Sequence, residues 1–110
     1  MITWSVETLD SRVDAELEAL PADMRERFVR IARLLQEFGP QNVREPYVKP
    51  LAGKLWEMRM KGRDGIARAV YVAATGRRLV VVHAFVKKTQ KTPRSALETA
   101  RTRAEEAGLI

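Results

Sequence analysis

The amino-acid sequence predicts an α+β fold, in which a twisted antiparallel sheet of about four strands carries an N-terminal helical hairpin on one face and is followed by a C-terminal helix. Three observations lead to this fold class. They are apolar residues at helical spacing in the first third of the chain, period-two alternation through the middle, and a Thr-Pro pair before an alanine-rich end. A chain of 110 residues has the usual size of one domain, so residues 1–110 are expected to fold as a single unit.

The N-terminal third is expected to form a short strand and then two helices. Residues 2–6 alternate around Trp4, as a strand does. Residues 8–19 place apolar side chains three and four positions apart, which gives one apolar stripe on a helix. Pro21 suits the first turn of a second helix, and Gly39 suits its C-terminal end. The apolar positions of the two helices are Leu9, Val13, Leu17, Leu20, Met24, Phe28, Ile31, Leu34, Leu35 and Phe38.

The middle of the chain alternates as strands do. Residues 39–54 hold prolines and glycines without periodicity and are expected to form a loop. Residues 55–60, 66–74 and 79–86 follow as three strands of an antiparallel meander. The run 79–86 is apolar on both faces, which predicts a central strand that the N-terminal strand flanks. Thr92-Pro93 then has the form of a cap and first turn for a last helix, whose apolar positions are Ala96, Leu97, Ala100 and Ala104.

The charge of the chain points to an anionic partner. Twenty lysines and arginines against fourteen acids give a formal net charge of +6. Between Arg59 and Arg94 there is a single acid, Asp64, so the positive surface is expected in the second half of the chain. Such a surface gains affinity for nucleic acids because each phosphate that it neutralises releases counterions. A basic protein without any nucleic-acid function has the same composition.

The composition also excludes several classes of site. The chain has no cysteine and one histidine, which excludes a disulfide framework and gives no metal-ligand cluster, so neither a metal nor a cofactor is expected. No apolar run is long enough to span a bilayer, and the first ten residues lack the features of a secretion signal. The expected location is therefore the cytoplasm, with no membrane partner.

Candidate chemical residues gather on the predicted strands and the loop after them. Glu57 and Arg59 share one strand face, and Arg68 on the next strand lies beside them if the register allows it. Such arginines form a cleft for a phosphate; otherwise they are scattered solvated side chains. The loop 87–91 adds positive charge that could follow an RNA backbone. The alternation groups His83 with Leu79, Val81 and Phe85, where it is either an acid–base group or a packed core residue.

Three segments, VKPLAGKLWEMRM, IARAVYV and VVHAFVKKTQKTP, resemble the RelE/ParE toxin superfamily, and more closely its phage-derived HigB-like branch. The resemblance covers nearly the whole chain, including the hairpin that ends in LLQEFGP. It implies a RelE-like fold and the toxin of a type II toxin–antitoxin pair. The resemblance further implies a metal-independent endoribonuclease that cuts messenger RNA on the ribosome and so inhibits translation. Besides messenger RNA and the ribosome, the implied partner is an antitoxin, which in this branch commonly carries a helix-turn-helix domain.

The resemblance also implies roles for individual residues. Arg68 would hold the phosphate and Lys88 would stabilise the charge that develops on it. Lys49 or Glu57 would be the base, and His83 the acid. The implied catalytic set is Arg68, Lys88, Arg59, Lys49, His83 and Glu57, and the implied RNA-binding residues are Lys54, Lys87 and Lys91.

Two other functions fit the sequence. Ribonucleases of this superfamily often carry a tyrosine or a second histidine near the C-terminal end, and neither follows His83 here. A ParE-like inhibitor of DNA gyrase without enzymatic activity is therefore one alternative, although the string HAFVKKTQ argues against it. The other alternative is a catalytically inactive, phage-derived RNA-binding protein.

Overall fold

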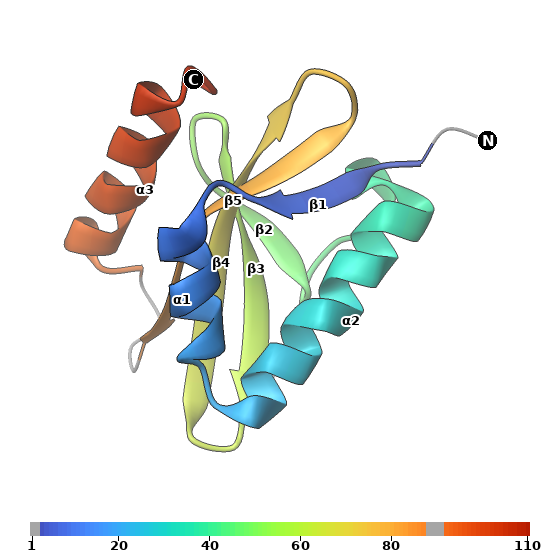
Figure 1. Ribbon diagram of the computed structural model, residues 1–110. Coiled ribbons are helices and arrows are strands. Elements are labelled where there is room, and N and C mark those ends of the chain that lie inside the picture. The colour runs from blue at the N-terminus through green and yellow to red at the C-terminus, as the bar shows by residue number, and fades with distance from the viewer. Residues whose placement is uncertain (1–2, 88–91) are drawn as a thin grey trace.

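The computed structural model describes residues 3–87 and 92–110, which form one five-stranded sheet and three α-helices (Figure 1). The strand order across the sheet is β1-β5-β4-β3-β2. Along the chain the elements are β1 (Ser5–Thr8), α1 (Ser11–Glu18), α2 (Ala22–Phe38), the 3-10 turn η1 (Pro40–Asn42), β2 (Val48–Ala52), β3 (Leu55–Gly62), β4 (Gly65–Ala74), β5 (Arg78–Lys87) and α3 (Arg94–Glu106).

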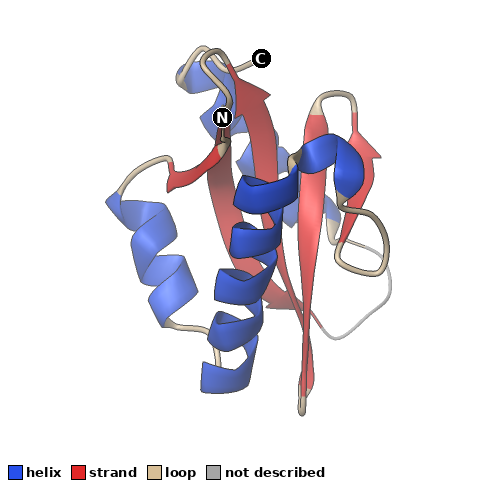
Figure 2. Ribbon diagram, turned by 90° about the vertical axis from the view of Figure 1, so that its right-hand side faces the viewer, coloured by secondary structure: helices blue, strands red, loops and turns tan. Residues whose placement is uncertain are grey.

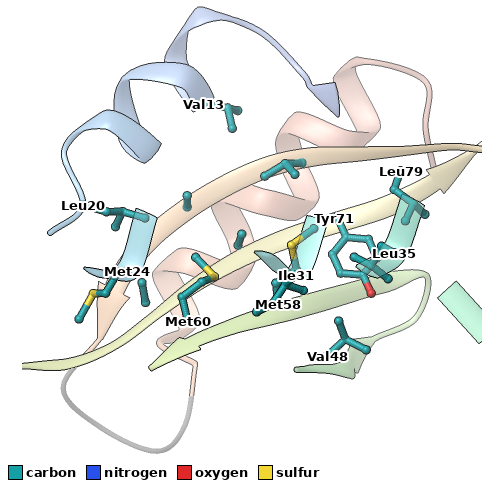
Figure 3. Packing of buried hydrophobic residues seen from close by; sticks show 14 of the residues in the cluster. Val13, Leu20, Met24, Ile31, Leu35, Val48, Met58, Met60, Tyr71 and Leu79 are labelled. Atoms are coloured by element: carbon teal, nitrogen blue, oxygen red, sulfur yellow. The ribbon is translucent and has the colours of Figure 1, made fainter. Parts of the chain in front are cut away.

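Two layers of helices enclose the sheet. Helices α1 and α2 cover one face, as the predicted hairpin does, while α3 packs on the other face (Figures 1 and 2). The core under the hairpin includes Val13, Met24, Ile31, Leu35, Met58, Met60, Tyr71, Leu79 and Val81 (Figure 3). The smaller core under α3 joins Val70, Val72, Val80 and Val82 to alanines of that helix. The α+β class is confirmed, and helices pack on both faces of the sheet.

The sheet differs from the predicted one in two of its strands. The prediction of a loop throughout residues 39–54 was wrong, because Val48–Ala52 form β2 against β3. Pro50 lies in this strand, which is tolerated because β2 is at the edge of the sheet and needs no donor there. The sheet is also mixed rather than purely antiparallel, because β1 runs parallel to the central strand β5. The predicted neighbour relation of β1 and β5 is confirmed.

The helix ends follow from local chemistry. The Asp10 side chain accepts a hydrogen bond from the Arg12 backbone N–H at 3.0 Å and so caps α1. Helix α2 ends at Gly39, whose φ of 83° suits glycine and whose N–H donates to the Leu35 carbonyl oxygen. Within the described ranges no helix is long and apolar enough to cross a membrane.

A bulge in β5 changes which face His83 occupies. Tyr71 pairs with Val81, whereas the preceding Val70 pairs with His83, so β5 holds one extra residue at this point. Beyond the bulge the alternation is reversed, and the His83 ring stacks on Phe85 with 5.0 Å between ring centroids. The expected grouping of His83 with Leu79 and Val81 was therefore wrong, since those two residues belong to the core under the hairpin.

Candidate functional site

Strand register brings four cations and one acid to the sheet face on which α3 packs. Lys49 of β2 is opposite Glu57 of β3, and Arg59 of β3 is opposite Arg68 of β4. Residues directly opposite one another share a face, as do residues two apart on one strand. The predicted neighbourhood of Glu57, Arg59 and Arg68 is thus what the register shows.

Lys87 completes this group from β5. Phe85 pairs with Arg68, and Lys87 follows two positions later on the same face. We refer to Lys49, Arg59, Arg68 and Lys87 as the cation cluster.

Glu57 is the anionic centre of the cation cluster. Its Oε1 accepts a hydrogen bond from Arg68 Nη1 at 2.6 Å and lies 3.9 Å from Lys49 Nζ. Its Oε2 accepts from the Thr92 hydroxyl at 2.9 Å. Both the Glu57 and the Arg68 side chains are fully buried. A buried ion pair of this kind holds both side chains in one geometry, because separating them would leave a charge in a medium that solvates it poorly.

The opposition of Arg59 and Arg68 is unfavourable for stability, although the ion pair of Arg68 with Glu57 offsets part of the repulsion. Like charges directly across two strands repel each other. Arg59 Nε is also buried, and it has no hydrogen-bond partner within residues 3–87 and 92–110. An anion between the two strands would relieve both costs, and a phosphate has the oxygens to accept from guanidinium groups.

The cluster changes the protonation of its own members. Burial lowers the pKa of Lys87, and the positive charge of Arg68 lowers it further, while Glu57 partly offsets both effects. Burial also lowers the pKa of Arg68, against the opposing influence of Glu57. A guanidinium remains protonated under all ordinary conditions. The neutral form of Lys87 is consequently easier to reach than that of an exposed lysine.

The cluster is not an open cleft. Arg68 is 0% exposed and Lys87 is 4% exposed, so the expected open pocket around Arg68 is not what the structure shows. The physical reason is the pairing of Arg68 with Glu57, which allows both charges to be buried. Solvent reaches the cluster at the Lys49 side chain, which is 34% exposed, and at the partly exposed Arg59.

Lys54 lies apart from the cluster, in the turn between β2 and β3. It lines a pocket of about 730 Å³ on the hairpin side of the sheet, together with Trp4, Trp56 and Tyr71. The walls of this pocket are mostly apolar, which suits an apolar or aromatic group better than a phosphate. Two further predicted residues, Lys88 and Lys91, lie outside the described residues.

His83 belongs to a second cluster, at the side of β5. Its Nδ1 is 3.0 Å from Glu16 Oε1, and Glu16 also accepts from Arg103 of α3 and from the Ala84 backbone N–H. Arg103 in turn donates to the Val82 carbonyl oxygen. The pairing of β1 with β5 ends at Val81. Beyond it, the Glu16 and Arg103 side chains form hydrogen bonds with backbone groups of β5 that have no neighbour on this side among the described strands. The arrangement gives His83 an evident structural role, whereas its role as an acid stays a prediction.

Acid should weaken this second cluster through Glu16. Burial opposes ionisation of Glu16, but hydrogen bonds from Arg103, the Ala84 N–H and His83 outweigh it and lower the pKa of the carboxyl. A carboxyl whose pKa is lower in the folded state stabilises the fold above its unfolded pKa, and the contribution disappears as pH falls through the folded value. We expect Glu16→Gln to be less stable than the native chain at pH 7, with a difference that shrinks below about pH 4.3. Urea unfolding at a series of pH values measures it, and a difference independent of pH would contradict the assignment.

Thr92, Glu16 and Arg103 are the residues of these two clusters that sequence reasoning missed. Thr92 was expected to cap the last helix, but the N-cap of α3 is Pro93 and no side chain bonds there. The Thr92 hydroxyl bonds to Glu57 instead, 35 positions away in sequence. Contacts between residues so distant depend on the packing of α3 against the sheet, so no local sequence signal could have shown them.

Comparison with known proteins gives the family of the chain. A family model described as "Phage derived protein Gp49-like" matches residues 15–105, which is most of the chain. The chain belongs to this family. The Gp49-like proteins are a RelE/HigB-like family of type II toxins, so the resemblance seen in the sequence to the RelE superfamily is confirmed.

Solved structures support the fold of this Gp49-like protein. A chain of the "Crystal structure of archaeal RelE-RelB complex from Pyrococcus horikoshii OT3" is similar to it, with 23% sequence identity and a TM-score of 0.55. The similarity covers 78% of this chain and 96% of that chain. At this identity the likeness is one of fold. No curated protein matches the sequence.

Proposed function

We propose that this Gp49-like protein is the toxin of a type II toxin–antitoxin pair and acts as a metal-independent endoribonuclease on messenger RNA. The observation that carries the proposal is the cation cluster, in which Arg59 and Arg68 oppose each other without a stability benefit. A phosphodiester suits the accessible part of this cluster, because its free oxygens can accept from the Arg59 guanidinium and the Lys49 ammonium, while the buried Arg68 contributes its charge. The expected substrate is the messenger on the translating ribosome, so the expected location is the cytoplasm.

The proposed reaction is an attack of a ribose 2′-hydroxyl on the adjacent phosphorus. A base takes the 2′ proton, the bond from phosphorus to the 5′-oxygen breaks, and an acid protonates that oxygen. The products are a 2′,3′-cyclic phosphate and a 5′-hydroxyl end. Arg59 and Arg68 stabilise the extra negative charge of the phosphorane, and Lys88 has the same expected role.

Lys49 is the proposed base, because its side chain is 34% exposed, whereas Lys87 is only 4% exposed. Glu57 already binds Arg68 through one oxygen and Thr92 through the other. We therefore assign Glu57 to holding Arg68 rather than to taking the 2′ proton.

Mapping of new RNA ends tests this function. Purified protein is added to translating ribosomes, and the 5′ ends of the messages are sequenced. New ends in phase with codons support the ribonuclease. Intact messages together with broken or relaxed DNA would instead support the gyrase inhibitor, and RNA binding without new ends would support the inactive RNA-binding protein.

The proposed protein partner is an antitoxin, as the complex of the similar archaeal structure suggests. An acidic segment is expected to cover the basic surface, because the chain carries a net charge of +6. A helix-turn-helix antitoxin encoded beside the toxin gene is the form expected in this branch. Suppression of growth arrest by co-expression of that neighbour supports the pairing, and persistent arrest would contradict it.

A further inference from the structure

We propose that Thr92 is a positioning residue of the ribonuclease site, which fixes the Glu57 carboxylate and through it the guanidinium of Arg68. The inference rests on the proposed function and adds to it a residue outside the expected site. Thr92 lies just before α3, and residues 88–91 separate it from β5 along the chain. Its hydroxyl joins this part of the chain to the buried acid of the cation cluster.

The geometry around Glu57 divides its two oxygens between different parts of the fold. Oε1 accepts from Arg68 Nη1 of β4 at 2.6 Å, and Oε2 accepts from Thr92 Oγ1 at 2.9 Å. A carboxylate held at both oxygens cannot rotate about its terminal torsion without breaking a bond. Because Glu57 is fully buried, bulk water cannot readily replace a donor that is lost. Thr92 therefore restricts the direction in which the carboxylate presents Oε1 to Arg68.

The Thr92 hydroxyl donates its hydrogen bond to Glu57, and the start of α3 has no side-chain cap. Threonine is a favoured capping residue, yet the N-cap of α3 is Pro93, which has no side-chain cap bond. The helix also buries only small side chains, Ala96, Ala100 and Ala104. A cap would benefit such a helix, so the bond to Glu57 is not explained by local helix stability.

Loss of the Thr92 hydroxyl should affect catalysis rather than RNA binding. A freed carboxylate lets the Arg68 guanidinium leave the geometry that the transition state needs, and small misplacements of this kind reduce rates strongly. In the proposed function, the accessible Lys49 and Arg59 bind the RNA backbone. Among the described residues, neither of them forms a hydrogen bond with Thr92. The two effects can therefore be separated by measurement.

The test compares Thr92→Val with Thr92→Ser. Valine keeps the size and branching of threonine without the hydroxyl, and serine keeps the hydroxyl. We expect Thr92→Val to reduce kcat by roughly 10- to 100-fold. KM and the Kd for a 2′-deoxy RNA that cannot be cleaved should stay within about twofold of the native chain, a change well below 1 kcal/mol. Thr92→Ser should restore kcat. Thr99→Val is the matched control, because the bond that the described residues give to that hydroxyl is to the Ser95 carbonyl oxygen within α3.

A second measurement reports on Arg68 without any need for RNA cleavage. Rotation of the Arg68 guanidinium in the full chain can be followed by ¹⁵N NMR, and we expect it to be faster in Thr92→Val but unchanged in Thr92→Ser and Thr99→Val. If this rotation responds while the native chain cleaves no RNA, the proposed function fails and the positioning contact stands. If the native chain cleaves RNA and Thr92→Val cleaves it equally fast, the inference about Thr92 is overturned. Loss of kcat that serine does not restore would also overturn it.

Discussion

Arg59→Met is expected to reduce RNA cleavage by about 10²- to 10³-fold, the loss typical of removing one donor from a developing oxyanion. The same change should leave the fold intact or stabilise it by about 0.2–1 kcal/mol, because it removes a like charge from directly opposite Arg68. It also removes the buried Arg59 Nε, which has no partner in the described part of the chain. Loss of activity with a gain in stability distinguishes a functional residue from a structural one.

Arg30→Met is the matched control for that experiment. Arg30 is exposed on α2, on the hairpin side of the sheet, and its replacement changes the net charge by the same amount. We expect this variant to cleave RNA at the native rate, apart from a small general weakening of affinity. Equal losses of activity in both variants would mean that net charge, and not the position of Arg59, determines cleavage.

Arg68→Ala is expected to destabilise the fold by about 3–5 kcal/mol, because it leaves the Glu57 carboxylate buried without its main partner. Urea unfolding at pH 7 measures the change. Because Arg68 is a fully buried half of an ion pair, a loss of toxicity in this variant would not by itself show a role in cleavage. A free energy of unfolding within 1 kcal/mol of the native value would show that the pair matters little for stability.

The double variant Glu57→Leu/Arg68→Met separates the two roles of Arg68. Replacing a buried ion pair by apolar side chains of similar volume is often neutral or stabilising, so the double variant should recover much of the stability that Arg68→Ala loses. The double variant should not cleave RNA, because neither the Arg68 guanidinium nor the Glu57 carboxylate remains. Recovery of both stability and cleavage would remove Arg68 from the site.

Much of the fold could be predicted from periodicity. The stripe from Met24 to Leu35 gave the second helix, and the alternation of Leu55, Glu57 and Arg59 against Met58 and Met60 gave the faces of β3 correctly. The strand β2 was missed because it is short and contains a proline, features that describe a loop equally well. The bulge in β5 was missed because it has no composition of its own and inserts its extra residue within an apolar run.

The site was predicted less fully than the fold, since it depends on register. Arg59 and Arg68 could be named from their strands, but only pairing in space shows that they are directly opposite. Burial of Arg68 could not be expected from sequence, because it requires Glu57 at hydrogen-bonding distance. The position of Thr92 depends on how α3 returns to the sheet, and the long separation from Glu57 leaves no local signal.

The most direct test of the cation cluster is a sequencing experiment on a defined message translated by purified ribosomes. The native chain, Arg59→Met and Arg30→Met are compared at equal concentration, and new 5′ ends are counted. The cluster as described predicts ends in phase with codons for the native chain and Arg30→Met, with a reduction of about 10²-fold or more for Arg59→Met. Undiminished cleavage by a folded Arg59→Met variant, or intact messages with the native chain, would contradict the assignment of this sheet face to RNA cleavage.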